Sequence, residues 1–175
     1  MPFAHGPVLA YVGRGRYRTV GSTEYVGATD RITIPDGFET DLASVPRLFW
    51  ALLPPQGAYE RAAVLHDYLC VQLAARQWPR GSDGRILYVT SRHTDGLFRR
   101  VMREAGVGFV TRWVMWCGVR WGALANPARR AGWWRDAPAV LAITAGVLVV
   151  ALGASWGLHE GIAATLTLLT GQEAP

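Results

Sequence analysis

Lysine is absent from this sequence, and all 18 of its basic residues are arginine. We attribute this to a GC-rich coding sequence rather than to a function that requires guanidinium groups. Cysteine is nearly absent as well, and both cysteines, Cys70 and Cys117, lie within apolar helical patterns. Such a pair argues against a disulfide framework and predicts two buried thiols in a reducing compartment.

A signal peptide is also missing at the start of the chain. Residues 1–13 have neither a charged start nor a long apolar run, so they predict no export. Half of the 175 residues are apolar and 18% are charged, which excludes a disordered tail and allows one domain with an appendage. Charged residues are frequent up to Asp136 and nearly absent beyond it.

The long uncharged segment, residues 137–157, predicts a transmembrane helix. At 1.5 Å per residue, about 21 residues span roughly 30 Å, the thickness of a hydrocarbon core. Trp133 and Trp134 precede the segment and Trp156 closes it, as in the aromatic belts of membrane helices. The alternative is a buried core helix, which a small domain seldom builds with apolar residues on every face.

Charge around this segment predicts its orientation. Arg129, Arg130 and Arg135 precede it, whereas only His159 and Glu160 follow closely. By the positive-inside rule, we expect the N-terminal domain in the cytoplasm. The net charge of +5 fits contact with an anionic membrane surface, so a lipid membrane is the expected partner. Nucleic-acid binding rests on net charge alone and ranks last.

The remaining patterns predict an α+β fold: N-terminal β-strands and hairpins, then a small antiparallel helical bundle and the C-terminal transmembrane helix. β-Branched and aromatic residues predict strands at Val8–Val12, Tyr17–Val20 and Arg31–Pro35, with a turn at Gly13–Arg16. Apolar spacing predicts helices between Pro46 and Leu53 and at Ala58–Arg76, Ser91–Ala105 and Val107–Leu124.

We therefore expect four parts along the chain. They are a soluble α+β domain (1–126), an Arg/Trp-rich juxtamembrane linker (127–136), the transmembrane helix (137–157) and a short C-terminal tail (158–175). Within the tail, Gly161–Thr170 is too short for a second crossing. It lies at the interface, extends the first helix or pairs with another copy, and the sequence leaves the oligomeric state open.

An HD motif, His66-Asp67, lies in the middle of an otherwise apolar helix. Burying an imidazole and a carboxylate costs on the order of several kcal/mol unless each finds a partner or a metal. If this helix packs antiparallel to the next, Asp95 reaches a ring nitrogen of His66 and makes it a general base. Asp67 is then available to bind a hard cation such as calcium, completed by backbone carbonyls and Asp41.

Each of these residues also has a purely structural interpretation. Asp95 lies in the first turn of its helix, where the helix dipole favours it and Arg99 is its i+4 neighbour. His66 can be a satisfied core histidine, and Asp41 can cap the short helix that follows it. A zinc site is disfavoured because the sequence has no HExxH or CxxC motif.

Three blocks of sequence carry a resemblance to a known family: IPDGFETDLASVPR (Ile34–Arg47), PPQGAYERAAVLHDYL (Pro54–Leu69) and SRHTDGLFRRVMREAGV (Ser91–Val107). In this order they resemble the phage and prophage family named domain of unknown function 1353, across roughly Ile34–Leu124. The resemblance implies a phage or prophage origin but no activity.

The same helices also resemble those of calcium-dependent phospholipases A-two, which carry an HD pair followed by an aspartate on the next helix. That resemblance implies a general base at His66, a calcium ligand at Asp67 and an orienting carboxylate at Asp95. The sequence departs from the pattern at Cys70, where those enzymes have a tyrosine, and it has no clear glycine-rich calcium loop. A glycine inside a helix, such as Gly96, lowers helix stability by about 1 kcal/mol relative to alanine. We expect Gly96 to permit close packing of another helix.

Two functions follow. The first is a membrane-anchored phage or prophage accessory or virion protein of a tail, entry or lysis module, with other phage proteins as partners and the polar residues fixing helix packing. The alternative is a calcium-dependent hydrolase of phospholipase A-two type that acts on membrane lipid through a His66–Asp95 dyad. The expected location is the bacterial inner membrane, or the virion.

Overall fold

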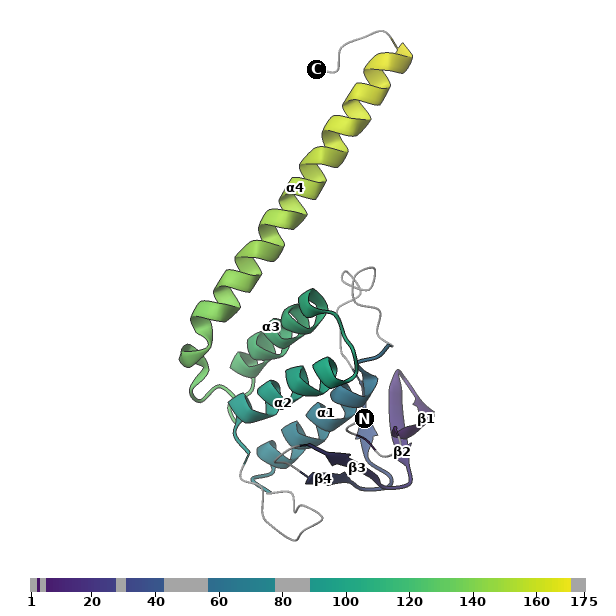
Figure 1. Ribbon diagram of the computed structural model, residues 1–175, viewed down its shortest axis with the longest axis vertical. Coiled ribbons are helices and arrows are strands. Elements are labelled where there is room, and N and C mark those ends of the chain that lie inside the picture. Colours follow the sequence, from purple (N-terminus) through teal and green to yellow (C-terminus); the bar gives the residue numbers. More distant parts are fainter. Residues whose placement is uncertain (1–2, 4–5, 28–30, 43–56, 78–88, 171–175) are drawn as a thin grey trace. The chain divides into compact units, whose positions relative to one another are not determined.

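The computed structural model describes residues 3, 6–27, 31–42, 57–77 and 89–170. The chain forms two compact units, Met1–Asp136 and Ala137–Pro175. Strands precede three helices in the first unit, and the second is built on one long helix (Figure 1), which confirms the predicted α+β class and order of elements. The short helix expected between Pro46 and Leu53 lies outside the described residues.

The first hairpin forms where the sequence predicts it. Strands β1 (Val8–Gly13) and β2 (Arg16–Val20) pair antiparallel, and β5 (Glu39–Thr40) adds to β2 to give the order β1-β2-β5. The predicted turn between β1 and β2 is confirmed, because Gly13, Arg14 and Gly15 all have positive φ, at 93°, 53° and 72°. Glycine adopts this left-handed region at little cost, so the turn is tight.

The second hairpin supplies the strand side of the core. Strand β3 (Thr23–Val26), which the sequence analysis did not predict, pairs antiparallel with β4 (Arg31–Ile34). In β4, Ile32 and Ile34 are fully buried while the residues between and before them are exposed. This alternation is the period-2 pattern of a strand with one face on the core.

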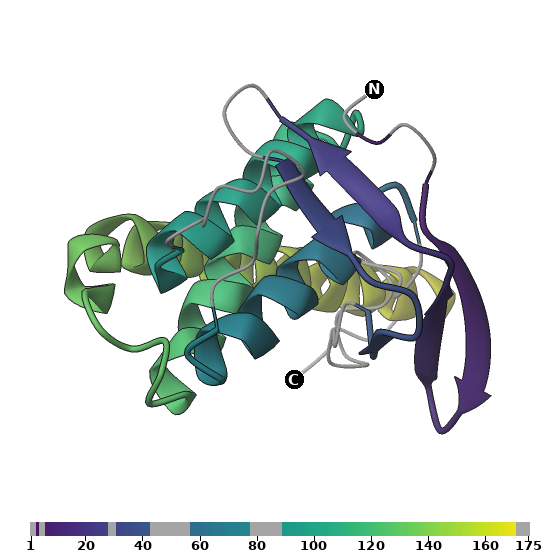
Figure 2. The same cartoon turned by 90° about the horizontal axis from the view of Figure 1, so that it is seen from below.

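The described part of the first unit has three α-helices: α1 (Glu60–Ala74), α2 (Ser91–Glu104) and α3 (Phe109–Ala125). Figures 1 and 2 show them side by side, with the strands grouped next to α1. Helices α2 and α3 run in opposite directions, as two contacts show. Arg120 near the end of α3 reaches Ser91 at the start of α2, and Arg99 in the second half of α2 meets Trp113 near the start of α3.

One hydrophobic core joins the two hairpins to the helices. It contains aromatic and aliphatic side chains of β3 and β4, the apolar faces of α1 and α2, and Met115 of α3. Helix α2 buries residues three and four positions apart, and the side chain of Thr90 caps its start by accepting a hydrogen bond from the His93 amide at 3.1 Å. The core thereby holds α1 and α2 in fixed register.

Residues 127–136, expected to be a linker, are bonded to the first unit. This segment contains the short 3-10 helix η2 (Trp133–Arg135). The indole Nε1–H of Trp133 donates to the carbonyl oxygen of Arg120 at 2.6 Å. The segment belongs to the compact unit Met1–Asp136.

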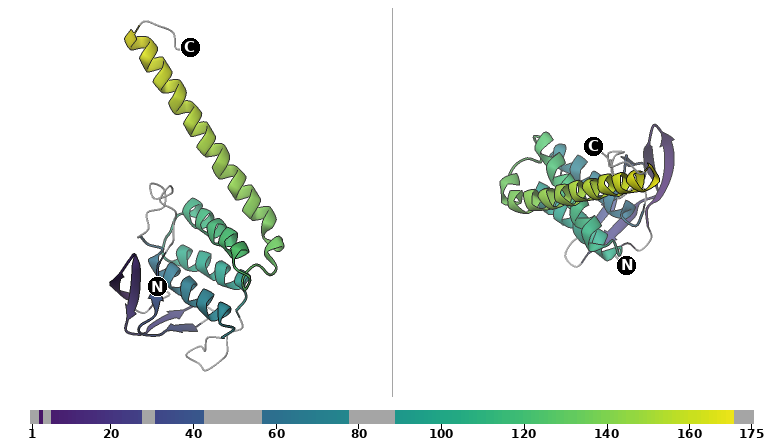
Figure 3. Two further views of the ribbon diagram at one scale, coloured as in Figure 1. Left: turned by 180° about the vertical axis from the view of Figure 1, so that it is seen from behind. Right: turned by 90° about the horizontal axis from the view of Figure 1, so that it is seen from above.

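The second unit contains a single continuous helix, α4 (Ala137–Thr170), shown from two directions in Figure 3. Of the alternatives for Gly161–Thr170, the structure therefore has the one in which this stretch extends the first helix. In the described part of the chain, one helix is long and apolar enough to cross a membrane, over Ala137–Leu169, and 6% of its most hydrophobic window is buried.

Candidate functional site

The packing of α1 against α2 brings the HD motif to Asp95. Nε2 of His66 lies 2.7 Å from Oδ1 of Asp95, a hydrogen-bond distance between two buried side chains. The expected meeting of these two residues is therefore observed. With Asp95 ionised, Nε2 carries the proton and donates it, so the other ring nitrogen, Nδ1, faces away from Asp95.

Two arginines bind the same carboxylate. Arg120 of α3 donates from Nη1 to Oδ2 of Asp95 at 2.8 Å, and Arg129 donates from Nη2 to Oδ1. The side chain of Arg120 is fully buried and that of Arg129 is 10% exposed. Both oxygens of Asp95 thus accept hydrogen bonds from positively charged groups, which is how a buried carboxylate stays ionised.

A second carboxylate extends the cluster. Asp136 lies 3.3 Å from Nη2 of Arg120 and 2.9 Å from Nε of Arg92, and Arg120 also donates to the hydroxyl of Ser91 at 3.2 Å. We refer to the connected side chains as the Asp95 network, and its members are His66, Ser91, Arg92, Asp95, Arg120, Arg129 and Asp136.

Electrostatics in this network favour an ionised Asp95. Burial by itself would raise the pKa of the carboxyl, but His66, Arg129 and Arg120 outweigh it and hold the pKa below the ordinary value of 3.8. The two acids, Asp95 and Asp136, balance the two most buried arginines, Arg120 and Arg129. Arg92, which pairs with Asp136 from a more exposed position, leaves the network with an excess of positive charge.

His66 is enclosed by groups that hold its proton. Burial would lower its pKa, but the nearby carboxylate of Asp67 and hydrogen bonds to Asp95 and the thiol of Cys70 overcome that effect and raise the pKa well above 6.5. Nδ1 lies 3.8 Å from Oδ1 of Asp67 and 3.8 Å from Sγ of Cys70. The ring also packs against Phe98, with centroids 4.9 Å apart. These neighbours favour the protonated form of folded His66.

Asp67 lies between His66 of the Asp95 network and Thr40 of strand β5. The hydroxyl of Thr40 donates to Oδ2 of Asp67 at 2.5 Å and accepts from the amide of Leu42 at 2.9 Å. Burial raises the pKa of the Asp67 carboxyl above 3.8, the charge of Asp41 adds to the rise, and His66 and Thr40 oppose it. Asp41 is exposed and close enough to act on Asp67 electrostatically.

The calcium prediction placed Asp67 and Asp41 around one ion. Asp67 and Asp41 lie in the same region, as a shared ion would require. Among the described residues, no group of three or more His, Cys, Asp or Glu side chains is arranged to hold a metal ion. The calcium site therefore stays a prediction.

Sequence reasoning missed the arginines. The structural alternative for Asp95 placed it beside Arg99, whereas Arg99 stacks on Trp113 with its Cζ 3.8 Å from the ring centroid. The available signal was Arg120, a charged residue inside the apolar pattern of α3. The expected role of Gly96 is wrong, because a Cβ at this position would meet nothing within 4 Å, so the glycine permits no close helix approach.

Comparison with known proteins identifies the family. Residues 18–119 match the family described as "Protein of unknown function (DUF1353)". The chain belongs to this family. The match runs from β2 to α3 and includes His66, Asp67 and Asp95, whereas Arg120, Arg129 and α4 lie beyond it.

An uncharacterized relative is similar over a short stretch. The uncharacterized protein y4jT of Sinorhizobium fredii (strain NBRC 101917 / NGR234) is 46% identical over 39 residues. Those residues are 21% of this chain and 12% of that protein, so the match spans a small part of the relative's length. No solved structure matches this chain.

Proposed function

We propose that this chain is a membrane-anchored accessory protein of a phage or prophage, with α4 as the anchor and Met1–Asp136 as a domain held at the membrane surface. The observation that carries the proposal is α4 itself. Its 33 residues Ala137–Leu169 are long and apolar enough to cross a membrane, and 6% of its most hydrophobic window is buried. Outside a membrane such a surface would remain in water at a large hydrophobic cost. The phage assignment draws on the family resemblance in the three sequence blocks.

The length of α4 suggests which part lies in lipid. At 1.5 Å per residue, 33 residues extend about 50 Å, more than the roughly 30 Å of a hydrocarbon core. The uncharged residues 137–157 fill that thickness, and the turns that carry His159 and Glu160 continue beyond it. Arg130 and Arg135 are exposed before α4 and favour a cytoplasmic location of the domain. Arg129 is buried and donates to Asp95, so it does not contribute to this charge at the membrane surface.

Fractionation of cells that express the full chain tests the anchor. We expect the protein in the membrane pellet, resistant to alkaline carbonate and released by detergent. Val149→Arg with Val150→Arg places two charges on exposed positions of α4, each costing about 2.5–3.5 kcal/mol near the centre of a membrane helix. This variant should lose membrane retention, and Val149→Leu with Val150→Leu should keep it. A soluble wild-type chain would refute the anchor.

On this proposal the Asp95 network is structural. It joins α1, α2, α3 and the segment 127–136 through hydrogen bonds to one buried carboxylate. A domain held this way presents fixed surfaces to other phage proteins, in keeping with the accessory or virion role. The bacterial inner membrane is the corresponding location in the host cell.

A second candidate is the calcium-dependent hydrolase, which one observation favours: the 2.7 Å bond between His66 Nε2 and Asp95 beside the HD aspartate. In that reaction Nδ1 of His66 removes a proton from water, and the hydroxide attacks the ester carbonyl of a lipid. The ester C–O bond then breaks, and the proton passes to the leaving alcohol. Asp67 and Asp41 would hold the calcium ion that stabilises the oxyanion.

The two candidates differ in their response to His66→Asn and Asp67→Asn. The full chain in vesicles with fluorescent acyl chains is assayed with calcium, with His159→Asn as the control. The hydrolase predicts acyl release that needs His66 and calcium binding that needs Asp67, with a rate that rises with pH as His66 loses its proton. No release and no calcium binding by a folded wild-type chain would leave the structural function alone.

A further inference from the structure

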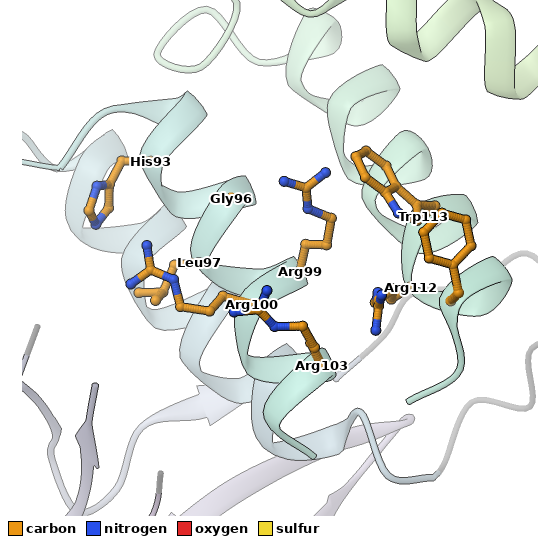
Figure 4. A pocket seen from close by; sticks show the side chains of 9 residues that line it. His93, Gly96, Leu97, Arg99, Arg100, Arg103, Arg112 and Trp113 are labelled. Carbon is orange, nitrogen blue, oxygen red and sulfur yellow. The ribbon is translucent and has the colours of Figure 1, made fainter. Parts of the chain in front are cut away.

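A cationic groove separate from the Asp95 network lies between α2 and α3. It has a volume of about 380 Å³, and four arginines line it: Arg99, Arg100 and Arg103 from α2 and Arg112 from α3. Figure 4 shows their side chains with Trp113 at one side. Gly96 also lines the groove, and a Cβ at this glycine would meet open space. Of the described residues that line the groove, none is acidic.

The arginines are held close together despite their repulsion. Arg99 is fixed between rings, with its Cζ 3.8 Å from the centroid of Trp113 and 5.4 Å from that of Trp116. Burial, together with the charges of Arg112 and Arg103, lowers the pKa of Arg99 below its ordinary value. Like charges gathered in a concave site destabilise one another, and an anion bound among them would relieve this repulsion.

The residues of the groove indicate which kind of anion fits. Guanidinium groups bind phosphate oxygens through paired hydrogen bonds, and several of them here face a space in the range of small-molecule sites. At the start of α3, Phe109 lines the groove and is 65% exposed, and Val110, which follows it in the chain but does not line the groove, is 72% exposed. Phe109 extends the aromatic wall, with its ring centroid 6.0 Å from that of Trp113.

We propose that this groove binds the phosphate head group of an anionic phospholipid, with Phe109 and Val110 in contact with the upper acyl chain. A phosphate alone would use the arginines and leave the apolar residues in water, whereas a lipid uses both. The proposal rests on the proposed membrane attachment only for access to lipid. The groove would then add a second contact with the membrane surface to the one through α4.

Calorimetry on the full chain tests the groove independently of the anchor. The protein is kept in a neutral maltoside detergent, so binding does not depend on whether α4 crosses a membrane. The titrant is monodisperse dihexanoyl phosphatidylglycerol, compared with dihexanoyl phosphatidylcholine, sn-glycerol 3-phosphate and a short single-stranded oligonucleotide. Saturable binding is expected for phosphatidylglycerol, much weaker binding for the others, and an affinity that falls with added salt.

Matched double variants locate the site. Arg103→Gln with Arg112→Gln should weaken phosphatidylglycerol binding at least about tenfold, because two charge-assisted contacts are lost. Arg14→Gln with Arg31→Gln removes the same charge from exposed positions on the strand side and should bind as the wild type does. Phe109→Ser with Val110→Ser should weaken phosphatidylglycerol binding and leave the weak binding of glycerol phosphate unchanged.

Several results would overturn the proposal. Equal loss in the two arginine variants would mean that net charge alone attracts the lipid. Glycerol phosphate bound as tightly as phosphatidylglycerol would make this a site for a free phosphate, and preferred binding of the oligonucleotide would make it a nucleic-acid site. Binding unaffected by Arg103→Gln with Arg112→Gln, in a chain that remains folded, would place the lipid elsewhere.

Discussion

At the scale of single residues, Asp95 is the side chain on which the most contacts depend. It is fully buried and accepts hydrogen bonds from His66, Arg120 and Arg129. A buried ion pair contributes little net stability compared with apolar packing, but breaking one strands the partner charge in a site of low dielectric. The cost of losing Asp95 is therefore set by the two arginines that remain.

We predict that Asp95→Asn destabilises the domain by about 3–5 kcal/mol, because the amide keeps the shape of the side chain but loses its charge. Its NH2 group would also face a guanidinium donor. Asp41→Asn, an exposed match for the same change, should alter stability by less than about 0.5 kcal/mol. Urea denaturation of the variants measures both effects, and equal stability of Asp95→Asn and the wild type would contradict the role given to Asp95.

His66 predicts a pH dependence of folding. Because the folded-state pKa lies well above 6.5, folded His66 keeps a proton that unfolded His66 releases above about pH 6.5. Its stabilising contribution is thus complete below that pH and is lost as pH rises through the folded-state pKa.

The free energy of unfolding should therefore fall on the alkaline side in the wild type, and the fall should be smaller in His66→Gln. Urea titrations from about pH 6 to pH 10 give the two curves. Parallel curves would mean that folded His66 has no raised pKa.

At the scale of elements, the segment before α4 is attached by contacts that no local pattern indicates. The composition of residues 127–136 predicts a polar, aromatic linker. In the structure Arg129 donates to Asp95, and Trp133 donates to a backbone carbonyl of α3. Asp136 pairs with Arg120. These contacts hold the segment against α2 and α3 of the first unit.

A pair of neighbouring tryptophans tests this attachment. Trp133→Phe keeps an aromatic ring, smaller than the indole, but loses the donor to the carbonyl of Arg120, so we expect a loss of about 1–2 kcal/mol. Trp134→Phe changes a side chain that is 71% exposed and should be nearly neutral. Thermal unfolding separates the two variants, and identical midpoints would show that the indole hydrogen bond does not hold the segment.

At the scale of the whole molecule, the division of the chain falls at Asp136, where one compact unit ends and α4 begins. A soluble fragment that ends at Asn126, the boundary read from the sequence, would lack two charged members of the Asp95 network. It would also lack the indole that binds the carbonyl of Arg120. The end point of a soluble fragment should therefore be chosen so that it keeps the whole Asp95 network, and not from the hydropathy of the sequence alone.

We expect a chain that ends at Asp136 to fold as a stable domain, and a chain that ends at Asn126 to be less stable by several kcal/mol. The reason is that Arg120 and Asp95 would each keep fewer partners in a buried site. Urea denaturation of the two fragments makes the comparison, with equal free energies of unfolding as the contrary result.

Local patterns predicted much of the fold because they report directly on local geometry. Strands β1, β2 and β4 and helices α1, α2 and α3 lie within a few residues of their predicted bounds, since apolar periodicity and breakers act over short distances. Strand β3 was missed because its buried residues, Thr23 and Tyr25, do not differ regularly in polarity from Glu24 and Val26, which follow them. The meeting of His66 with Asp95 was predicted only as a consequence of helix packing.

The sequence by itself determined the α+β order, the long apolar helix and the HD motif with its need for a partner, because each is a property of neighbouring residues. Only the tertiary structure decided that Arg120 and Arg129 share Asp95, that Asp67 turns to Thr40, and that four arginines line one groove. Those contacts join residues far apart in the chain, and their geometry depends on how the core aligns the helices.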